Sequence, residues 1–279
     1  GEHRLKDLRH TERIFQLLGP GLPAVETPPT TAEALHPRDR VRVAEPAPGS
    51  AQTGDSSTRE AGGIWASLEA ALRSDEGEAI TLTPAEATEL ARHKPADWRE
   101  WRLGRVAEWS QPRYRLDGRF VGLTLLIDQG EEAVQGRWQA AEERYEDLGE
   151  LLAATADPAI VVLGPPGGGK STLLRRLELD TAIEGLRDGD GATDRVTFFI
   201  SLNTFKPVRP GDPIPEPGEW LAERWASRSP DLPPLGDLLS EGRVTLLLDA
   251  LNEMPSAGEK EFRERVQLWK EWLQQLAVA

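Results

Sequence analysis

The chain of 279 residues contains no cysteine, which excludes disulfides, thiolate zinc sites, iron–sulfur clusters and thiol nucleophiles. Its four histidines, at positions 3, 10, 36 and 93, do not have the spacing of metal ligands. No apolar run approaches the roughly 20 residues that a membrane-spanning helix needs, and residues 1–20 lack a signal-peptide core. We therefore expect no membrane segment, and the absence of cysteine favours a cytoplasmic protein.

Positive charge is also scarce. Lysine and arginine number 33 against 47 acids, for a net charge of −14. Such a chain is not drawn as a whole to DNA or to an anionic membrane, so neither a nucleic acid nor a membrane is an expected partner. The chain begins with glycine and its only methionine is Met254, and we expect it to be a piece of a longer protein.

Four regions are predicted along the chain. Spaced leucines over residues 1–18 predict a short helix, the tail of an upstream domain. Residues 19–63 are rich in proline and have no aromatic side chain, a composition that predicts a disordered linker. Residues 64–130 predict a small helical region, with apolar residues at helical spacing and a short strand near its end. Residues 131–279 form the fourth region.

Tryptophan and arginine alternate over residues 98–119. An aromatic and basic surface for nucleic acid is one interpretation of this pattern. A helix packed on a neighbouring domain, with arginine stems lying along apolar surface, is the other. Because the aromatic residues share one broad helix face, we favour packing.

The fourth region begins with a predicted amphipathic helix over residues 132–153, whose acids would form a solvated face. The rhythm then changes to strand and helix. Strands are predicted at residues 159–163 (AIVVL), 196–202 (VTFFISL) and 244–248 (VTLLL), and a helix at 170–184. Continuous apolar runs separated by helices indicate an α/β fold in which helices cover both faces of a parallel sheet.

The first of these strands leads directly into GPPGGGKS, which fits G-x-x-x-x-G-K-[ST] and opens a helix. Glycines allow successive backbone N–H groups to approach phosphate oxygens, and the helix adds its positive end. Lys170 would reach the β- and γ-phosphates, and the hydroxyl of Ser171 would bind Mg²⁺. The predicted nucleotide-binding residues are Gly164, Pro165, Pro166, Gly167, Gly168, Gly169, Lys170, Ser171 and Thr172.

The last predicted strand is followed by an acid, Asp249. Ligands bind beyond the carboxyl ends of strands in open α/β sheets, so Asp249 is the second predicted Mg²⁺ ligand. Glu253 is predicted to orient or deprotonate the attacking water, and Asn252 beside it can orient water without accepting a proton. The alternative is that Asp249 caps a turn and Glu253 is a solvated surface acid.

The segments GPPGGGKST and LLLDALNEMP together resemble the NACHT domains of bacterial STAND-type P-loop NTPases. In these domains the metal-binding Asp is followed by a small residue, an apolar residue and two acids. Ala250 occupies the small position, whereas Asn252 replaces the first acid. The resemblance covers residues 120–275 and implies further strands, a sensor residue and helical modules. We therefore expect the domain to be truncated at Ala279 and its partners to include its own missing remainder and downstream sensor modules.

This resemblance favours a switch that binds ATP and Mg²⁺, hydrolyses ATP slowly and controls signalling or nucleotide-dependent homo-oligomerisation. No N-K-x-D motif for reading guanine is present, which favours ATP over GTP. Two alternatives stay open. One is a scaffold for protein contacts that holds nucleotide structurally or not at all, and the other is a P-loop kinase.

Overall fold

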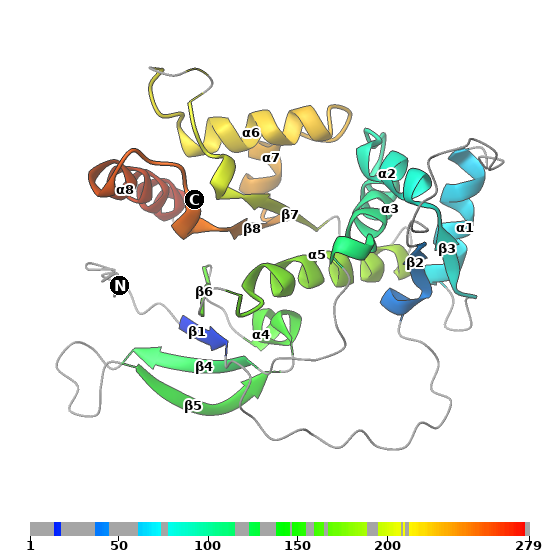
Figure 1. Cartoon of the computed structure of the whole chain (residues 1–279), viewed down its shortest axis with the longest axis horizontal. Coiled ribbons are helices and arrows are strands. Elements are labelled where there is room, and N and C mark those ends of the chain that lie inside the picture. The colour runs from blue at the N-terminus through cyan, green and yellow to red at the C-terminus, as the bar shows by residue number, and fades with distance from the viewer. Residues whose placement is uncertain are drawn as a thin grey trace, which may run out of the picture. The chain divides into compact units, whose positions relative to one another are not determined.

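The computed structural model describes residues 14–17, 37–44, 61–73, 78–114, 123–128, 138–145, 147–154, 159–164, 167–188, 195–207, 209 and 212–276. The chain divides into two compact units. The first unit comprises Gly1–Pro28 and Leu116–Leu177, and the second comprises Pro29–Arg115 and Glu178–Ala279. Figure 1 shows the elements that they contain. None of the helices in the described ranges is long and apolar enough to cross a membrane.

The first unit is built on a four-stranded mixed sheet of order β5-β4-β1-β6. Its strands are β1 (Ile14–Leu17), β4 (Leu123–Asp128), β5 (Trp138–Tyr145) and β6 (Val161–Leu163). β1 runs parallel to β6 and antiparallel to β4, and β5 is antiparallel to β4. A short helix, α4 (Leu148–Ala154), follows β5, and its Leu148 and Leu151 form a small core with Leu173. The strand that precedes the glycine-rich turn therefore pairs with a strand from the start of the chain.

Two helices predicted for this unit are wrong over the residues that the structure describes. The segment expected to be one helix over 132–153 contains strand β5 and then α4, and residues 131–137 lie outside the described ranges. Asp147 begins a new helix, because its side chain accepts a hydrogen bond from Glu150 N at 2.9 Å. Within the helix expected over 1–18, the described residues form β1. In both cases pairing with β4 overrides the local periodicity.

The second unit begins with a group of small elements that we call the helical module. Its helices are α1 (Ala61–Arg73), α2 (Pro84–Arg92) and α3 (Trp98–Trp109), its short strands are β2 (Val41–Val43) and β3 (Ile80–Leu82), and its 3-10 turns are η1 (Pro37–Arg40) and η2 (Pro112–Tyr114). A capping box begins α2, as its sequence favours. Glu86 N donates to Thr83 Oγ1 at 3.2 Å, and Thr83 N donates to Glu86 Oε2 at 2.8 Å.

Residues 37–44 differ from the disordered linker that their composition predicts. They contain η1 and β2, and β2 pairs in parallel with β3. Val41 is buried in the core of the helical module. The prediction rests on the composition of the whole range 19–63, which is rich in proline and has no aromatic residue. An average of this kind conceals the short apolar–polar–apolar alternation Val41-Arg42-Val43.

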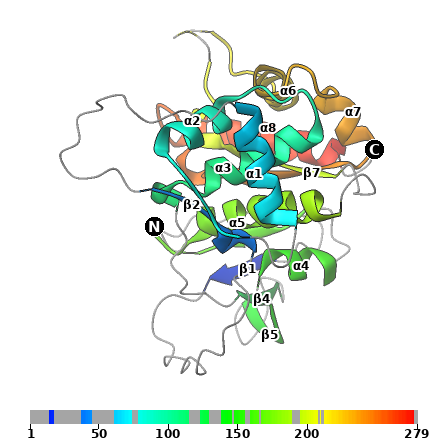
Figure 2. The ribbon, with the colours of Figure 1, turned by 90° about the vertical axis from the view of Figure 1, so that its right-hand side faces the viewer.

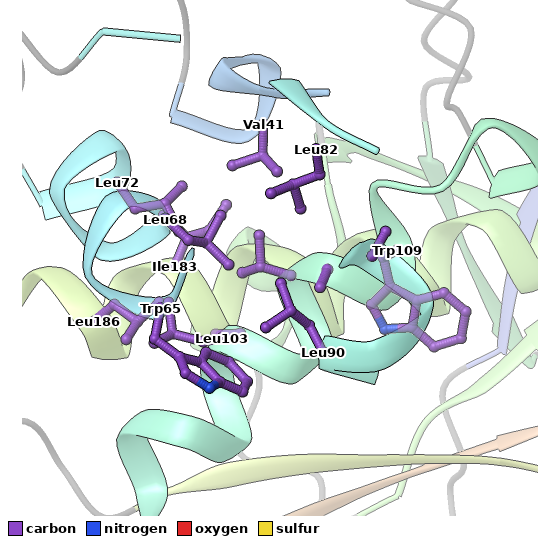
Figure 3. Close-up of a cluster of buried hydrophobic side chains, with 14 of the residues drawn as sticks. Val41, Trp65, Leu68, Leu72, Leu82, Leu90, Leu103, Trp109, Ile183 and Leu186 are labelled. Atoms are coloured by element: carbon purple, nitrogen blue, oxygen red, sulfur yellow. The ribbon is translucent and has the colours of Figure 1, made fainter. Parts of the chain in front are cut away.

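The core of the helical module includes the second half of α5 (Lys170–Arg187). Figure 3 shows Ile183 and Leu186 of α5 among side chains of α1, α2 and α3. The buried members are Val41, Ile64, Trp65, Leu68, Leu72, Leu82, Ala87, Leu90, Leu103, Val106, Ala107, Trp109, Leu179, Ala182, Ile183 and Leu186. Figure 2 shows α1 and α3 beside this part of α5. The module is therefore completed by a helix from much later in the chain.

The rest of the second unit alternates strands and helices. Its elements are β7 (Val196–Ser201), η4 (Leu202–Thr204), α6 (Pro217–Arg228), α7 (Leu235–Ser240), β8 (Val244–Asp249), η5 (Leu251–Glu253) and α8 (Glu259–Leu276). β7 and β8 are parallel, and Ser201 lies opposite Asp249 at their carboxyl ends. The predicted α/β class is confirmed. Instead of one parallel sheet, the described strands place β6 in the sheet of the first unit and pair β7 with β8 separately.

The tryptophan and arginine stretch takes part in this packing. Trp101 is 3% exposed, and its ring lies 4.8 Å from that of Trp225 on α6. The guanidinium of Arg105, itself buried, lies 4.9 Å from the centre of the Trp101 ring. Over the described residues 98–114 the stretch thus contains a helix packed on the α/β part, as the favoured interpretation has it. Residues 115–119 lie outside the described ranges.

Candidate functional site

The turn after β6 has the backbone that its glycine pattern predicts. Gly167 and Gly169 have φ angles of +73° and +85°, a left-handed conformation that costs glycine little and other residues more. The turn begins at Gly164 and ends where α5 starts at Lys170. Pro165 and Pro166 lie outside the described residues. Left-handed residues in such a turn allow neighbouring N–H groups to converge, which suits an anion.

Lys170 is held across this turn. Its Nζ donates a hydrogen bond to the carbonyl oxygen of Gly164 at 2.7 Å, so the ammonium group links the two ends of the loop. Ser171 and Thr172 occupy the first turn of α5, where Ser171 is half-buried and Thr172 exposed. Leu173 packs with α4 and fixes the start of α5 within the first unit. An ammonium group, a hydroxyl and a helix N-terminus thus occur together in one segment, a combination that suits an anion such as phosphate.

The end of β8 carries the predicted acids, in the second unit. Asp249 is the last residue of the strand and only 8% exposed. Ala250 follows with φ 59° and ψ 39°, the only positive φ among the described residues other than glycine. The chain then forms η5, in which Glu253 N donates to the carbonyl oxygen of Ala250 at 2.9 Å. Asn252 and Glu253 are both exposed, so their side chains are open to water and to a ligand.

The structure brings the predicted residues together as two groups. The glycines, Lys170, Ser171 and Thr172 share one turn of the first unit, and Asp249, Asn252 and Glu253 share one turn of the second. In the part of the chain that the structure describes, no group of three or more His, Asp or Glu side chains could hold a metal ion by itself. Mg²⁺ commonly uses one or two protein oxygens and completes its shell with phosphate and water. The oxygen donors of this kind include the hydroxyl of Ser171 in the first group and the carboxylate of Asp249 in the second.

The sequence motifs do not predict the polar residues beside the turn that follows β8, which we call the acidic turn. Ser201 ends β7 opposite Asp249, and η4 then packs against η5. The hydroxyl of Thr204 donates to the carbonyl oxygen of Ser201 at 2.8 Å and closes this turn, while Asn203 is exposed. The available signal is the change from apolar to polar residues directly after VTFFI, which resembles the change after VTLLL. These side chains border the acidic turn without belonging to a recognised motif.

Comparison with known proteins gives one match. Residues 158–278 match the family model of the NACHT domain. The matched segment begins just before β6 and contains both turns described above, whereas residues 1–157 lie outside it. No curated protein and no solved structure matches the chain.

Proposed function

We propose that this chain binds ATP with Mg²⁺, hydrolyses ATP slowly and acts as a switch within a larger protein. The proposal starts from the match of residues 158–278 to the family model of the NACHT domain, a P-loop NTPase domain. The observation that carries the proposal is the hydrogen bond between Lys170 Nζ and the Gly164 carbonyl, across a turn with left-handed glycines. This arrangement prepares the loop for a phosphate group before any ligand arrives.

Binding of the triphosphate is assigned to the turn after β6. The backbone N–H groups from Gly167 to Ser171 would surround the β-phosphate, and the positive end of α5 favours its charge. Lys170 would exchange its contact with Gly164 for the β- and γ-phosphate oxygens. An ammonium group that already lies at the mouth of the loop needs little reorganisation to do this.

The chemical step is assigned to Asp249, Asn252 and Glu253. Ser171 and Asp249 would hold Mg²⁺, which when bound neutralises charge on the phosphates. Glu253 would orient the attacking water or accept its proton, and Asn252 would assist only by hydrogen bonding. With an amide in one of the two acidic positions, we expect turnover to be slow.

Calorimetry of ATP and Mg²⁺ binding to the full chain tests the proposal. Lys170→Ala should weaken ATP binding at least about tenfold, because the triphosphate loses its only lysine partner in the loop. Lys206→Ala is the matched control, since Lys206 is an exposed lysine of the second unit, and it should bind as the wild type does. Equal ATP affinity in the wild type and Lys170→Ala would contradict the assignment of the site.

The switch requires that the protein respond to the bound nucleotide. Sedimentation of the full chain with ADP, with ATP and with a non-hydrolysable ATP analogue should show a larger species in a triphosphate state. Binding without any nucleotide-dependent change, together with no detectable turnover, would favour the scaffold, for which Asn252 in place of an acid is the supporting observation.

A further inference from the structure

The helix α5 changes its surroundings along its length. It begins at Lys170 and runs for 18 residues. From Glu178 onward its buried side chains are those that face the helical module. Glu178 lies eight residues beyond Lys170, about 12 Å along the helix axis. One continuous helix therefore joins the residue assigned to phosphate binding to a carboxyl group at the edge of the helical module.

Glu178 connects three elements of the second unit. Its side chain is fully buried, with 0% exposure. Trp109 Nε1 on α3 donates to Glu178 Oε2 at 2.7 Å, and the backbone N of Phe199 on β7 donates to Glu178 Oε1 at 2.9 Å. The rings of Trp109 and Phe199 also meet edge to face, with centroids 5.2 Å apart. Each carboxyl oxygen thus holds a different element against α5.

The charge of Glu178 is poorly compensated. Burial raises the pKa of this carboxyl to about 7, against the attraction of Arg105 and the two N–H donors. Glu108 repels it, and Arg105 and Glu108 both belong to α3. Arg105 pairs with Glu108, which also accepts a hydrogen bond from Arg228 Nη2 of α6 at 2.6 Å. The cation that attracts Glu178 is therefore shared with another acid.

The remainder of α5 is attached to the module by further polar contacts. Arg38 in η1 forms an ion pair of 3.1 Å with Asp180, and Arg73 of α1 donates to the carbonyl oxygen of Leu186 at 3.0 Å. Arg102 of α3 packs so closely on Gly185 that a Cβ there would overlap its guanidinium group. Together these contacts join η1, α1 and α3 to the second half of α5.

From this geometry we propose that Glu178 is a positioning residue that couples nucleotide binding at the start of α5 to the packing of the helical module on its second half. The inference rests on the proposed ATP site. A helix is stiff over two turns, so a shift at Lys170 moves the carboxyl of Glu178 as well. Hydrogen bonds to two fixed donors are directional, whereas apolar contacts tolerate small displacements. By linkage, packing of the module must affect nucleotide affinity to the same extent.

Hydrogen exchange of the full chain with and without ATP and Mg²⁺ tests the coupling. In the wild type, ATP should slow exchange both in the turn before α5 and in α1–α3. Glu178→Gln keeps the shape but leaves only one oxygen to accept two N–H donors. In this variant the turn should still be protected by ATP, and the protection of α1–α3 should fall at least about fivefold. Glu223→Gln, an exposed glutamate of α6, should behave as the wild type does.

Two further measurements separate coupling from a merely structural role. Trp109→Phe removes the donor to Oε2 and keeps an aromatic ring, so it should reduce the coupling even if Glu178→Gln does not fold. The wild type should also lose part of the coupling between pH 8 and pH 6 as Glu178 takes up a proton, whereas Glu178→Gln should give the same value at both.

The possible results distinguish a failure of the coupling from a failure of the proposed ATP site. If ATP protects the turn but never protects α1–α3 in the wild type, the coupling is overturned and the ATP site stands. The coupling is also overturned if both variants keep the full protection of α1–α3. If ATP protects no segment of the wild type, the proposed function fails and the coupling fails with it.

Discussion

The turns that follow β6 and β8 have similar backbone conformations but different residues. Each leaves a short strand and passes through left-handed residues, which are Gly167 and Gly169 in the first unit and Ala250 in the second. The first turn presents backbone N–H groups and one lysine, whereas the second presents carboxylates and an amide. A site made of backbone dipoles is suited to binding, and one made of acids to holding a metal and moving a proton. Substitutions in the two turns should therefore separate affinity from turnover.

The largest expected effect is in the second turn. Glu253→Gln should leave ATP affinity unchanged and reduce single-turnover hydrolysis by roughly 10²-fold or more, the scale of a lost general base. The exposed side chain of Glu253 can reach a water outside the protein, and its amide replacement cannot accept the proton. Glu259→Gln, an exposed acid at the start of α8, is the control. Equal hydrolysis in Glu253→Gln and the wild type would make Glu253 a bystander and favour the scaffold.

The buried acid of the second unit provides a contrast to exposed Glu253. Burial raises the pKa of Glu178 from 4.5 to about 7, so between these values the folded state holds a proton that the unfolded state releases. The stability that this proton supplies is fully present below about pH 4.5 and is lost as the pH rises through about 7. At about 1.4 kcal/mol per pKa unit, the loss is roughly 3 kcal/mol.

Urea unfolding at pH 5 and pH 8 measures this loss. Because the chain has two units, exchange of the α3 and α5 amides should be followed so that the second unit is observed directly. Glu178→Gln should remove the part of the pH dependence that Glu178 contributes, and Glu223→Gln should retain it. The same pH dependence in the wild type and Glu178→Gln would show that the carboxyl of Glu178 titrates near its ordinary value.

A smaller effect is expected at Asp249, the proposed metal ligand of the second turn. Asp249→Asn keeps the size of the side chain and removes the charge that would face Mg²⁺. The Mg²⁺ concentration needed for half-maximal ATP binding should rise by roughly tenfold, while binding of ATP without metal should change little. Asp237→Asn, at an exposed position of α7, is the control. Superimposable Mg²⁺ titrations of the wild type and Asp249→Asn would contradict the assignment of Asp249.

The two turns are predictable from sequence because each is specified locally. GPPGGGKS contains both the glycines and the lysine, and VTLLLD contains both the strand and its terminal acid. The strand β5 is not predictable in this way, because its spacing fits a helix and its pairing with β4 decides the outcome. The surroundings of Glu178 are equally hidden, since its two donors come from Trp109 and Phe199, which are 69 and 21 residues away in sequence. Local patterns indicate chemistry, and long-range packing determines which acids are buried.

The smallest expected effect concerns the left-handed backbone conformation that occurs in both turns. Ala250 has φ 59°, where a residue with a Cβ costs about 1–2 kcal/mol. Ala250→Gly relieves this cost but loses more chain entropy on folding, by about 0.5–1 kcal/mol. The net result should be a second unit that is more stable by about 0.5 kcal/mol, measured by the exchange of its slowest amides.

The reverse change, Gly169→Ala, places a Cβ at φ 85° and should destabilise the first turn and weaken ATP binding. If Ala250→Gly were instead destabilising, the left-handed conformation would not be the native state of this turn. The rate of ATP hydrolysis by Ala250→Gly is a second measurement, because Glu253 N donates a hydrogen bond to the carbonyl oxygen of residue 250. A more stable variant with slower hydrolysis would show that the strained alanine holds Glu253 in place, whereas unchanged hydrolysis would show that glycine can replace it.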